Sequence, residues 1–229
     1  MIPFHPKHAA LAAMLAVGVV PSQAALIVSE VAPWGSGNSS YAADWFEVTN
    51  TGVAAVDVRG WRMDDGSNNF ATTVALRGVT SIAAGQSVIF LEGRADGATD
   101  AAIDAAFVSA WFGANAPAGL VIGNYGGSGV GLGTGGDGVN LFKADGTRVT
   151  GIRFPDSTSS VGRSFDNASG VENAGVAQLS TIGVNGAFLS FDGSATGSPG
   201  AIAAVPEPGT WAFLISGLVL LGAAVLRRA

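Results

Sequence analysis

The stretch that decides the fold is Asp44-Trp45-Phe46-Glu47-Val48-Thr49-Asn50-Thr51-Gly52, followed after three residues by Val56-Asp57-Val58-Arg59-Gly60-Trp61-Arg62-Met63-Asp64-Asp65. In the first part, Phe46 and Val48 alternate with larger or more polar side chains. In the second part, Val56 and Val58 alternate with charged residues. Alternation at every second position is typical of β-strands, so we predict two strands with a turn between them.

Similar patterns predict the other strands. A β-branched run at residues 26–32 ends at Pro33 and gives the first strand. An Asp145-Gly146 turn between two alternating segments predicts a hairpin. The strands expected after residue 65 cover residues 74–76, 87–91, 139–143, 148–154 and 161–166.

One helix is expected in this part of the chain, from Thr99-Asp100 to Phe112-Gly113. Its apolar residues recur at helical spacing, at positions 103, 107, 110 and 111. Asp100 and Asp104 are four residues apart, as paired catalytic acids could be. Acidic residues in a first helical turn are ordinary capping chemistry, and we interpret them so.

Three segments together resemble the lamin-tail domain family. They are the opening strand with Glu30-Val31, the stretch quoted above, and the closing Gly197-Ser198-Pro199-Gly200. The resemblance runs from about Leu26 to Ala201 and implies a mainly β, immunoglobulin-like antiparallel β-sandwich with one helical insertion. It also implies a binding or structural module. The residues that carry the motif are Glu30, Trp45, Glu47, Asn50, Gly60, Trp61, Pro199 and Gly200.

The C-terminal end has the properties of a membrane segment. Sixteen apolar residues from Trp211 to Leu226 would span about 24 Å as a helix, a little less than the hydrocarbon core of a bilayer. Pro206 and Pro208 delay the start of the helix, so we expect it at about residues 210–226. Arg227 and Arg228 follow it, and positive charge stays on the cytoplasmic side. The chain before Pro206 is therefore expected outside.

This end also resembles the PEP-CTERM sorting tail. The residues that carry the resemblance are Pro206, Glu207 and Pro208, the apolar run, and the final Arg227 and Arg228. The resemblance implies an exosortase-type processing protease as a partner and export alongside extracellular polysaccharide. The tail would then anchor the chain in the membrane before processing, after which the protein would lie at the cell surface or in the extracellular matrix.

The N-terminal end is typical of a secretory signal peptide. Lys7 precedes an apolar run at residues 9–20, and small residues follow it, so cleavage is predicted between Ala24 and Ala25. An uncleaved anchor is the alternative. The expected organisation is a signal peptide at 1–24, a β-sandwich at 25–201, a linker at 202–205 and the tail at 206–229.

Composition excludes several reaction classes for the exported part. Sixteen of the seventeen Asp and Glu but only eight of the eleven Lys and Arg lie within residues 25–205, giving a net charge of −8. This balance disfavours nucleic acid as a partner. The two histidines, His5 and His8, lie in the signal peptide, and the chain has no cysteine. A Ser-His-Asp or Cys-His centre is therefore excluded, and no cofactor is expected.

Two acidic or glycine-rich regions leave alternatives open. Gly131-x-Gly133-x-x-Gly136 has the letters of a dinucleotide fingerprint, but a strand pattern follows it where phosphate binding needs a helix. Residues 126–142 imitate two turns of a calcium-binding β-roll, so calcium stays an alternative to a flexible loop. Asp64 and Asp65 begin a solvated turn.

We therefore interpret the exported part as a non-enzymatic structural or binding protein. Its partners would be glycans or envelope proteins, bound through loops at residues 34–41 and 125–138. Exposed side chains of Trp34 and Tyr125 would favour that hypothesis, and buried ones would weaken it. The alternatives are a calcium-binding adhesion module and a metal-dependent hydrolase or nuclease, which would need the carboxylates of Asp64, Asp65 and Asp137 to converge.

Overall fold

The structure is a computed structural model, and it describes residues 26–201. The predicted signal peptide, its cleavage site at Ala24 and Ala25, and the tail with Pro206, Glu207, Pro208, Arg227 and Arg228 lie outside the described residues. Within residues 26–201, no helix is long and apolar enough to cross a membrane.

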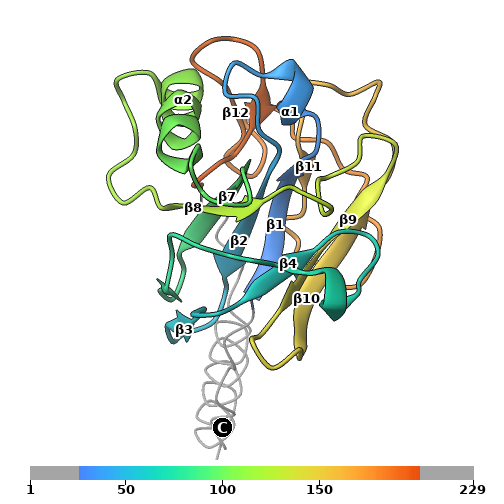
Figure 1. Cartoon of the computed structure of the whole chain (residues 1–229). Helices are drawn as coiled ribbons and strands as arrows, with labels where there is room; N and C mark the ends of the chain where they lie inside the picture. The colour runs from blue at the N-terminus through green and yellow to red at the C-terminus, as the bar shows by residue number, and fades with distance from the viewer. Residues whose placement is uncertain (1–25, 202–229) are drawn as a thin grey trace, which may run out of the picture.

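The centre of the fold is a five-stranded sheet in the order β11-β1-β2-β7-β8 (Figure 1). Its strands are antiparallel except for β7 and β8, which are parallel because helix α2 (Asp100–Phe112) crosses over between them. The helix was predicted, and it gives the antiparallel fold its one parallel pair among the named strands. The strands are β1 (Leu26–Ala32), β2 (Trp45–Asn50), β7 (Ser87–Gly93), β8 (Ile122–Gly126) and β11 (Phe165–Asp166).

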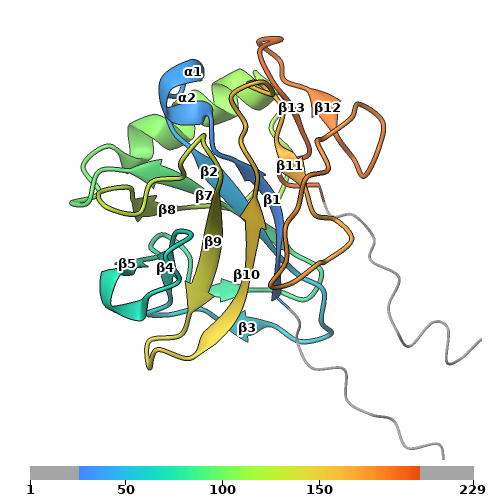
Figure 2. The same ribbon diagram turned by 90° about the vertical axis from the view of Figure 1, so that its right-hand side faces the viewer.

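A second, four-stranded sheet packs against one face of the first, in the order β10-β9-β4-β5. Figure 2 shows β9 and β10 crossing in front of β1 and β2. The main hydrophobic core lies between the sheets and includes Phe46, Met63, Phe90 and Leu141. This is the β-sandwich that the resemblance to the lamin-tail domain implies. The strands are β4 (Arg62–Asp64), β5 (Val74–Ala75), β9 (Asp137–Phe142) and β10 (Arg148–Phe154).

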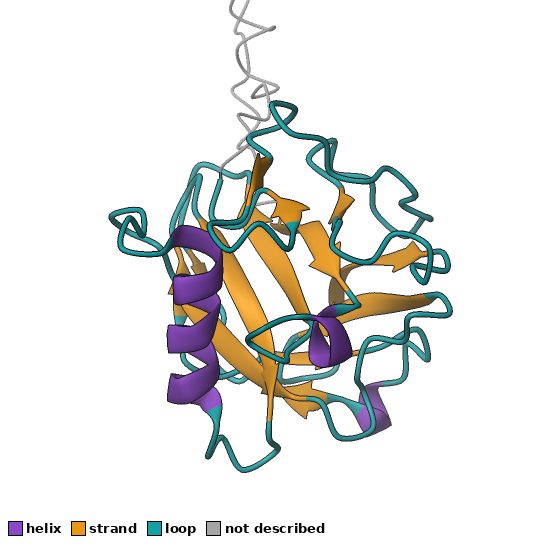
Figure 3. Cartoon of the chain, turned by 90° about the horizontal axis from the view of Figure 1, so that it is seen from above, coloured by secondary structure: helices purple, strands orange, loops and turns teal. Residues whose placement is uncertain are grey.

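Helix α2 forms a third layer on the outer face of the five-stranded sheet (Figure 3). Phe107 and Trp111 of the helix pack on Trp45, with ring centroids 5.8 Å apart in both pairs. Ile89 and Leu91 of β7 belong to the same cluster. Every residue of β2 is therefore buried, whereas a strand exposed on one face would alternate between buried and exposed.

The second half of the fold-deciding stretch is not one continuous strand. It divides into β3 (Val56–Asp57) and β4, which belong to different sheets. Between them, the Trp61 N–H donates to the Val58 carbonyl at 3.1 Å, and Gly60 has a φ of 72°. This left-handed conformation favours glycine, so Gly60 forms part of a turn rather than of a strand.

The remaining elements are short. The pairs β3–β6 and β12–β13 form two-stranded sheets, and the late strand expected at residues 161–166 is reduced to β11. The loop expected after Pro33 contains one helical turn. These elements are α1 (Gly35–Asn38), η1 (Phe70–Thr72), β6 (Ser81–Ile82), β12 (Phe188–Leu189) and β13 (Thr196–Gly197).

The two tryptophans of the stretch occupy different layers. Trp61 is in the core between the sheets, and Trp45 lies between the five-stranded sheet and α2. We expect Trp45→Ala and Trp61→Ala each to lower the free energy of unfolding by about 3 to 5 kcal/mol, because each removes a large buried side chain. Denaturant unfolding of the exported chain measures this. Val53→Ala, at a side chain that is 59% exposed, is the control. Unchanged midpoints in both tryptophan variants would contradict the layer assignment.

Candidate functional site

A β-bulge in β1 creates the most unusual polar site of the domain. The register between β1 and β2 shifts between Val28 and Glu30, so that Val28 and Val31 both face the core. The two residues between them, Ser29 and Glu30, then share the outer face, because a bulge adds one residue to one side of the strand. Glu30 lies opposite Glu47 of β2.

Glu30 is almost completely buried and is bound by residues from the end of the domain. One carboxylate oxygen accepts a hydrogen bond from the Ser198 N–H at 2.8 Å and another from the Ser164 hydroxyl. The other oxygen accepts from the Ser198 hydroxyl at 2.9 Å. The Ser180 hydroxyl lies 3.4 Å from the first oxygen. A strand at the start of the chain thus holds residue 198 in place.

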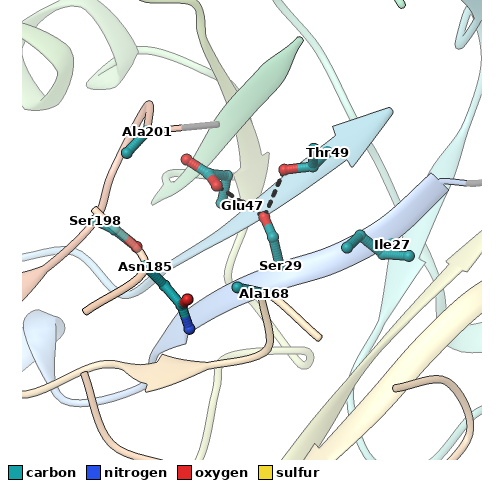
Figure 4. A pocket seen from close by; sticks show the side chains of 8 residues that line it. All are labelled: Ile27, Ser29, Glu47, Thr49, Ala168, Asn185, Ser198 and Ala201. Carbon is teal, nitrogen blue, oxygen red and sulfur yellow. Dashed lines mark hydrogen bonds between the residues drawn. The ribbon is translucent and has the colours of Figure 1, made fainter. Parts of the chain in front are cut away.

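Glu47 likewise holds Gly200, two residues after Ser198, in place. Its Oε2 accepts a hydrogen bond from the Gly200 N–H at 2.6 Å, and its Oε1 accepts from the Ser29 hydroxyl at 2.7 Å (Figure 4). Thr49 donates to Ser29 at 2.8 Å, and the hydroxyls of Thr49 and Ser87 are 2.6 Å apart. Since each hydroxyl has one proton, Ser87 donates to Thr49, and the chain of hydroxyls ends on the carboxylate. We call Glu30, Glu47 and their donors the carboxylate seam.

The cavity beside the seam is too small for a substrate. It has about 10 Å³ of space for the centre of a water molecule, which is room for one water at most. Figure 4 shows Glu47 and Ser29 on one side of it and Ser198 and Ala201 on another. The carboxylate seam therefore joins strands β1 and β2 to residues 198–200 and has no room for a substrate.

Burial changes the acidity of the seam. Burial raises the pKa of Glu30 from 4.5 to about 7, against the opposing effect of the hydrogen bonds from Ser164 and Ser198. Burial, together with the neighbouring charge of Glu30, raises the pKa of Glu47 from 4.5 to about 8. Two carboxylates this close resist being ionised together.

The other family-motif positions lie in turns and in the hydrophobic cores of the domain. Asn50 closes the turn after β2, because its amide donates to the carbonyls of Ala54 and Ile82 and its oxygen accepts from Gly52. Pro199 is buried between the two residues that the seam holds. With Gly60 in its turn and the two tryptophans in the cores, the motif positions lie in several layers rather than around one pocket.

The three aspartates considered for metal-dependent catalysis are engaged in turns. Asp64 is fully buried and accepts hydrogen bonds from the Ser67 hydroxyl, the Asn69 N–H and the Thr72 hydroxyl. Asp65 accepts from the Ser67 N–H at 2.8 Å. Asp137 accepts from the N–H groups of Gly66, Gly133 and Gly138. Within residues 26–201, no group of three His, Cys, Asp or Glu side chains could hold a metal ion.

The aromatic side chains of the two proposed binding loops point inward. Trp34 is 1% exposed and donates to the Arg163 carbonyl, and Tyr125 is fully buried in the main core. The glycine-rich loop before β9 also contributes Val130 and Leu132 to that core. The burial of both side chains weakens the hypothesis that these two loops bind ligands through Trp34 and Tyr125.

Sequence reasoning missed most of the donors in the seam. Ser164, Ser180 and Ser198 lie more than 130 residues after Glu30. Only Ser198 lies in a segment quoted for the family resemblance, and it was not named there as a motif position. The available signal was the presence of Glu30 and Glu47 within apolar strands, because a buried carboxylate requires hydrogen-bond donors.

We expect stability to fall as pH rises from about 5 to about 8, by several kcal/mol of unfolding free energy. Both glutamates have raised pKa values in the folded state, so the native chain binds more protons than the unfolded chain in this range. Glu47→Gln keeps an acceptor for Gly200 and removes a titrating group, so its pH dependence should be weaker. Denaturant unfolding at constant ionic strength measures this, with Glu172→Gln on the surface as the control. A steeper dependence in Glu47→Gln would refute the role of the seam.

Comparisons with known families match two parts of the chain. Residues 204–229 match the PEP-CTERM protein-sorting motif. No curated protein is similar enough to the chain to count as a match. Residues 20–156, more than half of the chain, match the Lamin Tail Domain model, which covers the motif positions from Glu30 to Trp61. The chain therefore belongs to the lamin tail domain family.

Proposed function

We propose that this protein is a non-enzymatic structural or binding component of the cell envelope or of the extracellular polysaccharide matrix. The sorting motif implies export, sorting through the C-terminal end to the cell surface, and processing by an exosortase. The lamin tail domain is then the part that is delivered. We propose residues 25–201 as this domain and residues 202–205 as its link to the tail.

The observation that supports the proposal best is the use of the motif carboxylates. Glu30 and Glu47 accept hydrogen bonds from Ser198 and Gly200 inside the domain, so their carboxylates are not available to bind a substrate. The seam also fixes the last residues of the domain just before the sorting motif. A domain closed in this way can remain folded after its tail has been cut, as a delivered structural unit must.

Glycans or envelope proteins remain the proposed partners, but through surfaces other than Trp34 and Tyr125. The acidic exported part, with its net charge of −8, disfavours nucleic acid. The enzymatic alternative has little support, because Asp64, Asp65 and Asp137 each satisfy backbone or hydroxyl groups of turns.

We expect no turnover of ester, peptide or phosphodiester substrates by the exported chain, with or without divalent metal ions. The chain has no histidine outside the signal peptide and no cysteine, and its aspartates are engaged. Chromogenic and fluorogenic substrate panels measure this. Metal-dependent turnover that disappears in Asp65→Asn, with folding unchanged by circular dichroism, would establish an enzyme instead.

We expect Glu207→Ala to block processing of the tail but not export. The mature wild-type protein from its native host should begin at Ala25 and lack residues 211–229, whereas the variant should keep them and accumulate in the membrane fraction. Intact-mass measurement of both proteins is the readout, and Glu172→Ala, at an exposed glutamate, is the control. A wild-type protein that retains residues 211–229 would show that the tail is a permanent anchor.

A further inference from the structure

A cluster of large apolar side chains is exposed near the end of the domain. We define the apolar loop patch as Ile182, Val184, Leu189 and Phe191, whose exposed fractions are 61%, 45%, 52% and 69%. All four lie within ten consecutive residues, in and beside β12, which Figure 2 shows at the upper right. Single exposed apolar residues are common on proteins, but a gathering of large ones marks an interaction surface.

The local structure turns Leu189 outward and places Phe191 beside Gly113 at the end of α2. Phe188 of β12 packs inward on Trp111 and Phe112 of α2, with centroid distances of 5.7 and 5.8 Å. Leu189, the next residue of the strand, therefore points to the other side, toward solvent. The preceding loop is closed by a hydrogen bond from the Gly183 N–H to the Ala187 carbonyl at 2.8 Å. The patch is thus part of an ordered, hydrogen-bonded segment.

The segment that carries the patch has almost no charge of its own, although the side chains of Arg163 and Asp166 are hydrogen-bonded to it at Thr181 and Asn185. Residues 173–191 contain no Asp, Glu, Lys or Arg, and Asp192 is the only charged residue between residues 173 and 206. Elsewhere, the exported part is acidic. The four patch residues are themselves uncharged, so an apolar surface would meet no charge repulsion from them.

The chain leaves the described domain beside this patch. A Cβ atom added to Gly186, which lies between Val184 and Leu189 in the sequence, would be 2.9 Å from the Cβ of Ala201. Gly200 is held by Glu47, so this exit point is fixed. Five residues separate Gly200 from Pro206, and they reach at most about 18 Å when extended. The sorting motif begins within that reach.

We propose that the apolar loop patch rests on the lipid surface of the membrane that holds the tail. The proposal depends on the membrane association of the tail given above, because the short tether brings the patch to the bilayer. Apolar side chains gain free energy by entering the interface between headgroups and acyl chains. An uncharged patch suits zwitterionic lipid in particular. The docked domain would present its C-terminal end to the processing protease in one orientation.

Site-specific fluorescence in the full chain tests this. The sequence has no cysteine, so Val184→Cys can be labelled at one position with an environment-sensitive nitrobenzoxadiazole dye. Ala71→Cys is the matched control, because Ala71 is exposed in η1, on the side of the domain away from β12 (Figure 2). Both proteins, with residues 202–229 retained, are reconstituted into phosphatidylcholine vesicles with nitroxide-labelled acyl chains, and flotation shows whether the tail holds the chain.

The expected result is quenching several-fold stronger at position 184 than at position 71, in chains that float with the vesicles. Adding Ile182→Ser and Leu189→Ser should reduce quenching at position 184 and leave flotation unchanged. Flotation without quenching at position 184 overturns the docking proposal alone. Fluorescence that depends on protein density but is not quenched by lipid would assign the patch to a second copy of the chain and also overturn it. Failure to float overturns the membrane association of the tail and the docking with it.

Discussion

Two carboxylates that lie side by side in the interior need hydrogen-bond donors, and this need determines how the domain is closed. Removing a carboxylate from water costs several kcal/mol unless it is paired or neutralised. Within β1 and β2, Ser29 and the hydroxyls behind it serve Glu47, but none of them reaches Glu30. The missing donors come from Ser164, Ser198 and Gly200, so the last part of the domain must return to its first two strands.

Two different parts of the chain cover the outer face of the five-stranded sheet and complete the third layer. Half of the outer face of β2 is covered by α2 through Trp45, and the other half is covered at Glu47 by the segment that ends at Gly200. The family motif therefore combines two physical tasks. Its tryptophans fill the apolar layers, and its glutamates bind the backbone of the closing segment. The bulge at Ser29 serves both, because it turns Val28 and Val31 to the core and Glu30 away from it.

The elements that were predictable from the sequence have strong local signals. Alternation predicted β2, a β-branched run predicted β1, an Asp-Gly turn predicted the β9–β10 hairpin, and helical spacing predicted α2 within a residue of its ends. The division at Gly60 was missed, because the alternation continues through a turn that only a left-handed glycine reveals. The short strand β11 was overextended, because it is held by β1 rather than by its own propensity.

The site was predictable only in part, for a related reason. Glu30, Glu47 and Gly200 were named through the family motif, but the contact between Glu47 and Gly200 joins residues 153 positions apart, and that between Glu30 and Ser198 joins residues 168 apart. Periodicity and spacing carry no information over that distance. The burial of Trp34 and Tyr125 was left open by the sequence, because both flank glycine-rich or polar loops, which are usually exposed. Here the loops fold back and place their aromatic side chains in the cores.

The position of residues 198–200 near the end of the domain also determines when the domain can finish folding. A chain that crosses a membrane from its N-terminal end delivers β1 and β2 first and residues 198–200 last. Until those residues emerge, Glu30 and Glu47 lack their backbone donors, and the outer face of the sheet stays open to water. The tail follows after only a few more residues. In such a chain the donors for Glu30 and Glu47 arrive just before the sorting motif, so that the domain can finish folding only when transport is almost over.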